Sequence, residues 1–160
     1  MKYIKQFTRI ICLSYLIVVN ISCSVQKKKI SIVALTMLSN SRNIEANGKI
    51  YHNRSDYYLV ENYNDDSQTE QFIDSFASVN KHLDYSQFDD YQIYFFKKSI
   101  YTNIEAIKSN KNQLNGYSVD EDYIYNYSWS KGKFAGKIKF VNGKPVGKKV
   151  ILEKLRDNNY

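Results

Sequence analysis

The side chains most often used for acid–base and metal chemistry are few and scattered in this sequence. Its two histidines, His52 and His82, are thirty residues apart, and neither has a cysteine, histidine or carboxylate at metal-ligand spacing. The acidic clusters at 65–66, 89–90 and 120–122 lack the alternating oxygen ligands and the glycine of a calcium loop. The sequence also has no Gly-x-Ser-x-Gly elbow and no phosphate-cradling loop. We therefore expect no enzyme activity, no cofactor and no metal, although two acids that meet in the folded chain could still act as a glycosidase pair.

Alternating aromatic residues make the segment 123–129 a candidate binding surface. The row consists of Tyr123, Tyr125, Tyr127 and Trp129. Side chains two residues apart lie on the same face of a β-strand, so we expect these rings on one face. An exposed row of rings would suit a glycan or a protein partner. The alternative, which we favour, is that the row packs against a helix, because a small domain with few Leu and Val residues needs its aromatic side chains for the core.

A run of lysines near the C-terminus is the second candidate binding surface. Seven lysines and no acidic residue occur in this run, and they are Lys131, Lys133, Lys137, Lys139, Lys144, Lys148 and Lys149. These charges could contact anionic lipid headgroups, an acidic glycan or a partner protein. The alternative is a solvated sheet edge whose lysines prevent edge-to-edge aggregation.

The chain as a whole is too short for several domains and too rich in core-forming residues to be disordered. It has 160 residues, of which 43% are hydrophobic and 15% aromatic. Its 23 basic and 16 acidic residues give a net charge of +7, but three of the basic residues lie within the first 22, where no acidic residue occurs. The small charge that remains does not predict binding to nucleic acid.

The first 22 residues have the three-part layout of a secretory signal. A basic stretch at 1–9 precedes an apolar run at 10–19, which has about half of the roughly 20 residues that a membrane-spanning helix needs. The chain continues as Asn20-Ile21-Ser22-Cys23, which resembles the signal of bacterial lipoproteins, with Asn20 in place of the usual Leu. The resemblance implies cleavage before Cys23 and attachment of lipid to that residue. The alternatives are an ordinary signal peptide and an uncleaved anchor.

Lipidation of Cys23 would decide where the protein is located. Several acyl chains on this residue would hold the protein on a membrane, and residues 23–29 would form a tether whose lysines at 27–29 lie near the headgroups. Ser24 is not the aspartate that retains some lipoproteins at an inner membrane, so we expect the outer membrane in a cell with two membranes and the outer face of the cell membrane otherwise. With Cys12 removed by cleavage, the exported domain would contain no thiol for a disulfide or for catalysis.

Strands are predicted where aromatic and β-branched residues cluster. The predicted strands are 57–63, 91–96, 123–129, 134–141, 144–155 and 30–38, the last of which could instead begin a short helix. Residues 39–56 are expected to form loops around a short segment at 49–51. The turn at 130–133 and the Asn142-Gly143 pair, a strong hairpin signal, join the last three strands into an antiparallel meander.

The main helix is predicted at 67–83. Ser67 and Glu70 have the spacing of a capping box, and apolar residues recur at helical spacing along the segment. The predicted apolar face consists of Phe72, Ile73, Phe76, Val79 and Leu83. Thr102 and Glu105 indicate a second, short helix.

A weak internal repeat lies within the predicted meander, over Gly132–Lys148. The sequence GKFAGK at 132–137 recurs eleven residues later as GKPVGK at 143–148. The pair resembles a fragment of the hairpin repeats of the MORN type. Because solenoids need three or more units, we favour two ordinary hairpin turns with protective lysines, and we infer no function from the repeat.

These features predict a single α+β domain over residues 30–160, with one main amphipathic helix covering a small antiparallel sheet. The expected protein is an envelope lipoprotein, held on a membrane by its lipid, whose domain has a non-enzymatic binding or structural role toward an envelope protein or glycan. One alternative is a tethered hydrolase, which predicts two carboxylates in a cleft beside an aromatic wall. The other is an inhibitor or immunity protein for another envelope protein, which predicts a flat patch without a cleft.

Overall fold

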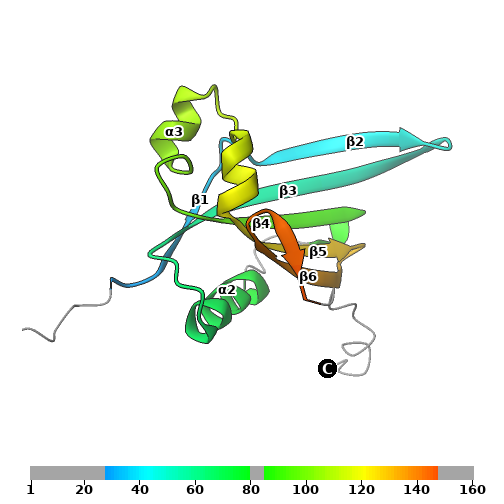
Figure 1. Ribbon diagram of the computed structural model, residues 1–160. Helices are drawn as coiled ribbons and strands as arrows, with labels where there is room; N and C mark the ends of the chain where they lie inside the picture. The colour runs from blue at the N-terminus through cyan, green and yellow to red at the C-terminus, as the bar shows by residue number, and fades with distance from the viewer. Residues whose placement is uncertain (1–27, 80–84, 148–160) are drawn as a thin grey trace, which may run out of the picture.

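The computed structural model describes residues 28–79 and 85–147, and its fold is α+β, as the sequence predicts (Figure 1). The strands of this part of the chain form one seven-stranded sheet. They are β1 (Ser31–Ala34), β2 (Asn40–Ala46), β3 (Lys49–Glu61), β4 (Asp90–Lys97), β5 (Tyr123–Ser130), β6 (Lys133–Val141) and β7 (Lys144–Val146). The helices are α2 (Ser67–Val79) and α3 (Ile104–Ser109), with short helical turns at Tyr85–Gln87 and Ser118–Asp122. The predicted signal segment and Cys23 lie outside the described residues.

The sheet has the order β1-β3-β4-β5-β6-β7, and β2 lies beside the first half of β3. Helix α2 connects β3 to β4, which are parallel, and every other pair of neighbouring strands is antiparallel. The predicted meander is confirmed, since β5, β6 and β7 follow one another through short turns. Its β6–β7 turn packs closely, because a Cβ on Gly143, at φ +69°, would lie 2.8 Å from the Asp120 Cα.

The prediction of loops over residues 39–56 is wrong, because this segment forms most of a long β-hairpin. Strands β2 and β3 pair from Asn40 with Ser55 to Ala46 with Lys49, and the hairpin extends beyond the body of the domain (Figure 1). Asn47 and Gly48, with φ of 54° and 69°, form its turn. Much of the hairpin is exposed on both faces, so its sequence lacks the alternation of apolar and polar residues by which strands are recognised.

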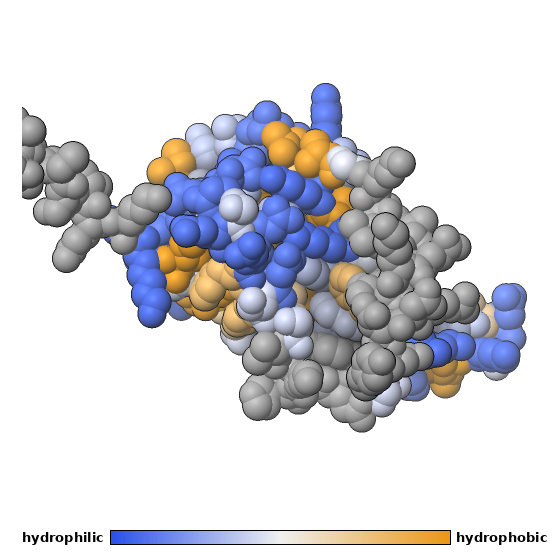
Figure 2. Space-filling view, turned by 90° about the horizontal axis from the view of Figure 1, so that it is seen from below, coloured by the Kyte–Doolittle hydropathy of each residue, from blue (hydrophilic) through white to orange (hydrophobic). Residues whose placement is uncertain are grey.

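One face of the sheet packs against α2. Ile73 and Ala77 are fully buried there, and Phe76 lies 5.0 Å from the Tyr58 ring and 6.1 Å from the Phe95 ring. The prediction that Phe72 faces the core is wrong, since its side chain is 40% exposed. The outward side of α2 is mostly polar, and Figure 2 shows a hydrophilic centre on the face of the molecule that carries this helix. This amphipathic pattern is the signal from which the sequence predicts the helix.

The predicted capping box at the start of α2 is also corrected. The Thr69 N–H donates to Asp66 Oδ1 at 2.8 Å, so Asp66 caps the helix one residue earlier than Ser67. Helix α3 covers part of the opposite face, where Ile107 packs with Leu35 and Leu59. No helix among residues 28–79 and 85–147 is long and apolar enough to cross a membrane.

Candidate functional site

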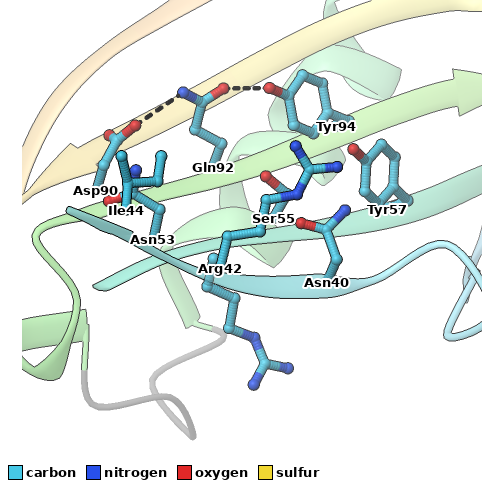
Figure 3. A pocket seen from close by; sticks show the side chains of 10 residues that line it. Asn40, Arg42, Ile44, Asn53, Ser55, Tyr57, Asp90, Gln92 and Tyr94 are labelled. Carbon is cyan, nitrogen blue, oxygen red and sulfur yellow. Dashed lines mark hydrogen bonds between the residues drawn. The ribbon is translucent and has the colours of Figure 1, made fainter. Parts of the chain in front are cut away.

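The part of the sheet that carries β2, β3 and β4 bears a row of polar side chains on the side opposite α2. We call this surface the polar face, and it consists of Asn40, Arg42 and Ile44 from β2, Asn53, Ser55 and Tyr57 from β3, and Asp90, Gln92 and Tyr94 from β4 (Figure 3). With Arg54, these residues line a pocket of about 270 Å³. The pocket is therefore assembled from the β2–β3 hairpin and from β4, which follows α2 in the chain.

Strand alternation explains why polar residues gather here. Along β4, the buried residues Tyr91, Ile93 and Phe95 pack in the core beneath α2, and the residues between them point to the other side. Gln92 and Tyr94 thus reach the polar face, beside Ser55 and Tyr57 of β3, which are in register with them. This pattern is expected for a sheet that is covered mainly on one side, because its strands are apolar on the covered face and polar on the other.

A chain of hydrogen bonds orders the side chains of β4. The Tyr94 hydroxyl donates to Gln92 Oε1, and Gln92 Nε2 donates to Asp90 Oδ2 at 3.1 Å (Figure 3). Burial, with smaller contributions from Tyr57 and Asp90, raises the pKa of Tyr94, so its hydroxyl keeps its proton at neutral pH. The amide of Gln92 is therefore held in one orientation within the pocket.

Asn53 contributes an unused hydrogen-bond acceptor to this pocket. Its side-chain oxygen Oδ1 is buried and has no hydrogen-bond partner within the described part of the chain. Asn53 lines the pocket and stands opposite Arg42 in the register of β2 and β3. A buried acceptor without a donor costs about 1–3 kcal/mol, so a ligand that donates to Asn53 Oδ1 would gain from this contact once the side chain turns the oxygen toward the pocket.

Aromatic rings form a row along one side of the pocket. The Tyr57 and Tyr94 rings stack with centroids 4.9 Å apart and an interplanar angle of 13°. Tyr123 continues the row at 5.9 Å from Tyr94, and Phe140 lies 4.1 Å beyond Tyr123. The row crosses β3, β4, β5 and β6, so the polar side chains lie next to an apolar wall.

A partly buried ion pair supports the same strands, and its buried carboxylate, Asp56, lies on the side that faces α2. The Arg54 guanidinium donates to both carboxylate oxygens of Asp56, and the Tyr91 hydroxyl donates to Asp56 Oδ2 at 2.7 Å. The hydrogen bond to Asp56 raises the pKa of Arg54 further, despite opposition from its partial burial. Because Asp56 lies between Ser55 and Tyr57, this cluster fixes the segment of β3 that carries both pocket residues.

The four aromatic residues predicted to share a face are divided between both faces of the sheet. Tyr125, Tyr127 and Trp129 are 1%, 4% and 7% exposed and pack beneath α2, which agrees with the favoured interpretation as core. A β-bulge shifts the register where β5 meets Phe95 and Phe96, with Tyr125 opposite Phe95 and Tyr123 opposite Phe96. The bulge puts Tyr123 on the other side, in the row beside the polar face.

The buried rings also border a second, mostly apolar cavity of about 430 Å³ between α2, β5 and β6. Its lining consists of Asp74, Ala77, Ser78, Tyr127, Trp129, Phe134 and Lys137. Its charged groups satisfy one another, because Lys137 Nζ lies 2.7 Å from Asp74 Oδ1 and the Tyr127 hydroxyl donates to the same oxygen. Burial and the Asp74 carboxylate raise the pKa of Tyr127 far above its ordinary value. Of these two cavities, the pocket on the polar face is the one whose lining includes a residue with an unpaired buried acceptor, Asn53.

The lysines of the predicted patch have different environments. Lys137 Nζ binds Glu70 and Asp74 of α2 at 2.6 and 2.7 Å and lies over the Tyr125 ring, and Lys139 Nζ binds Asp65 at 2.5 Å. Lys137 therefore joins α2 to the sheet, and Lys139 joins the sheet to the loop that precedes α2. Lys131, Lys133 and Lys144 are exposed, and Lys148 and Lys149 lie outside the described residues.

Two carboxylates do converge beside an aromatic wall, as the hydrolase alternative requires. Glu70 and Asp74, one turn apart on α2, meet at Lys137 next to Tyr127. The ammonium group stands between the two acids and binds both of them. To act as the proton donor and the nucleophile of glycoside hydrolysis, Glu70 and Asp74 would both have to break their ion pairs with Lys137.

Sequence reasoning missed the polar face because five of its nine residues lie in the segment 39–56, which is predicted to form loops. The signal that could have revealed it is the Asn47-Gly48 pair, the same type of hairpin turn that was recognised at Asn142-Gly143. In the described ranges, no group of three or more His, Cys, Asp or Glu side chains is arranged to hold a metal. Comparison of the chain with protein-family models, curated proteins and solved structures gives no match.

Proposed function

We propose that this chain is an exported lipoprotein, anchored through Cys23, whose domain binds a ligand on the polar face without transforming it. The observation that carries the binding role is the pocket of Figure 3, which is lined by polar side chains from three strands, among them Asn53 with its unpaired acceptor Oδ1. The anchoring role rests on the resemblance of Asn20-Ile21-Ser22-Cys23 to lipoprotein signals. The proposed location is the outer membrane of a cell with two membranes, or otherwise the outer face of the cell membrane.

The charges near both cavities favour binding over hydrolysis. Asp90, the acid of the polar face, accepts a hydrogen bond from Gln92. On the other face of the sheet, Asp56 is paired with Arg54. Glu70 and Asp74 are bound by Lys137. A carboxylate that is bound by a lysine or an arginine is not free to transfer a proton or to attack a substrate, as hydrolysis requires.

The pocket also distinguishes a small ligand from a protein partner. An inhibitor or immunity protein is expected to present a flat surface with an apolar centre. The polar face is hollowed, and among its residues Ile44 is the large aliphatic side chain, at 47% exposure. This arrangement suits a ligand that fits partly into the sheet surface.

Replacement of Cys23 by serine tests the anchor. The full-length Cys23→Ser chain should move from the membrane fraction to the soluble fraction and lose incorporation of a fatty-acid probe, because the acyl chains that hold the protein would be missing. Its melting temperature should equal that of the wild type. A Cys23→Ser chain that stays on the membrane, together with a wild type that takes up no probe, would show that the lipoprotein assignment is wrong.

The binding role is tested by nuclear magnetic resonance on the isotope-labelled chain in a detergent without a sugar headgroup. Envelope extract should shift the amide resonances of β2, β3 and β4 and leave those of α2 unchanged, because the polar face and α2 lie on opposite sides of the sheet. Treating the extract with protease beforehand distinguishes a protein partner from a glycan or small molecule. Unchanged resonances of β2, β3 and β4 at every extract concentration would refute binding at the polar face.

A further inference from the structure

We infer that the ligand of the polar face is a saccharide of one or two pyranose rings. This inference rests on the proposed function, which makes the polar face a binding surface. It follows from four properties of the pocket, namely its hydrogen-bonding groups, its charge, its aromatic wall and its size.

The hydrogen-bonding groups of the pocket suit a ligand rich in hydroxyl groups. Asn40, Asn53 and Gln92 carry side-chain amides, each of which can donate and accept, and Ser55 adds a hydroxyl that can do both. A sugar hydroxyl likewise donates one hydrogen bond and accepts others. A sugar hydroxyl can also donate to Asn53 Oδ1, the acceptor that has no partner, once the Asn53 side chain turns this oxygen toward the pocket.

The charge of the pocket is balanced, which disfavours a strongly ionic ligand. Arg42 and Asp90 lie on opposite sides of the polar face, on β2 and β4. Arg54 is neutralised by its bidentate contact with Asp56. A phosphate or a polyanion would meet Asp90, and a cation would meet Arg42. A neutral saccharide can use both charges, because charged groups form stronger hydrogen bonds with hydroxyls than neutral ones do.

The aromatic wall provides the apolar contact that sugars need. One face of a pyranose ring carries mainly C–H groups, and these pack on aromatic rings, whose faces are electron-rich. Tyr57 and Tyr94 lie directly beside Ser55 and Gln92, and a sugar can pack against the part of the two rings that their mutual stacking leaves open. The stacking of the two rings on each other fixes their orientation before a ligand arrives, so binding requires little ordering of the protein.

The size of the pocket limits the ligand. Its volume of about 270 Å³ is slightly below the roughly 300–1,000 Å³ of pockets that enclose drug-sized molecules. One or two sugar rings match this volume, and a longer glycan would extend across the open part of the sheet.

The test is a titration of the isotope-labelled chain, in a detergent without a sugar headgroup, with maltose, cellobiose and N,N′-diacetylchitobiose. At least one disaccharide should shift the resonances of β2, β3 and β4 saturably. Gln92→Leu and Asn53→Leu should each weaken that binding about tenfold, the effect of losing one good hydrogen bond. Ser41→Ala is the control, because Ser41 lies between Asn40 and Arg42 on β2 and points to the side opposite the polar face. The affinity of this variant for the disaccharide should stay within about twofold of that of the wild type.

The outcomes separate this inference from the proposed function. If no disaccharide shifts these resonances, or if well-folded Gln92→Leu binds as tightly as the wild type, the saccharide assignment is overturned. If envelope extract still shifts the resonances of β2, β3 and β4 in that case, the binding role stands with another ligand class, such as a peptide. If the extract also leaves them unchanged, both proposals fail. Equal melting temperatures of Gln92→Leu and the wild type establish that a loss of binding is local.

Discussion

Phe76→Ala is expected to lower the free energy of unfolding by about 3 kcal/mol or more, which is a large share of the stability of a small domain. Phe76 is the aromatic residue of α2 that contacts the sheet, with its ring 5.0 Å from Tyr58 and 6.1 Å from Phe95 in edge-to-face arrangements. Both partners lie on the central strands β3 and β4, so removal of the ring leaves a cavity where the helix meets the sheet. Denaturant unfolding followed by far-ultraviolet circular dichroism measures the change.

Phe72→Ala is the matched control for this prediction. It is the same substitution in the same helix, one turn earlier, at a side chain that is 40% exposed. Its effect should be below about 1 kcal/mol, because little apolar surface leaves a packed environment. If the two variants unfold at the same denaturant concentration, the orientation of α2 on the sheet is different from the one described.

The parts of the fold that could be predicted are those where one face of an element is buried. Helix α2 has a polar side and an apolar side, and β4 alternates between core and surface, so both elements have a clear period in the sequence. The meander was predictable for another reason, because Asn142-Gly143 supplies the positive φ that a tight hairpin turn requires. In these cases the residues of the element itself are sufficient to predict its secondary structure.

The long hairpin was missed because its stability comes from pairing rather than burial. Asn40 to Ala46 includes one apolar side chain other than alanine, Ile44, and β2 is held by its backbone register with β3. A strand of this kind looks like a loop in a sequence. Since β2 and the first part of β3 supply five of the nine residues of the polar face, the error in this hairpin also concealed the candidate site.

The aromatic row and the lysine run show a different limit of sequence reasoning. One bulge in β5 reverses the side of the sheet on which Tyr123 lies. Strict alternation of side chains every two residues does not predict such a bulge. The ion pairs of Lys137 and Lys139 join β6 to acids that precede them by more than sixty residues. Contacts of this kind depend on the tertiary fold, so a run of like charges in the sequence does not establish a free charged surface.

Asp56→Ala is expected to lower the free energy of unfolding by about 2–4 kcal/mol, although it removes a single carboxylate. Asp56 is 4% exposed, and it accepts hydrogen bonds from the Arg54 guanidinium and from the hydroxyl of the fully buried Tyr91. The alanine variant leaves the arginine without its partner ion and takes one acceptor away from Tyr91. The cost of such unmade contacts exceeds the modest net gain from an exposed ion pair.

A double-mutant cycle with Arg54→Met tests the cause of that loss. If the cost arises from the stranded guanidinium, the Asp56→Ala, Arg54→Met chain should be more stable than the sum of the two single changes predicts, because it removes both charges together. Asp56→Asn should lose less than Asp56→Ala, since the amide oxygen still accepts from Tyr91 or Arg54. Additive effects in the cycle would mean that Asp56 acts through packing alone. An Asp56→Ala chain as stable as the wild type would contradict the role of this cluster in holding the segment of β3 that carries Ser55 and Tyr57.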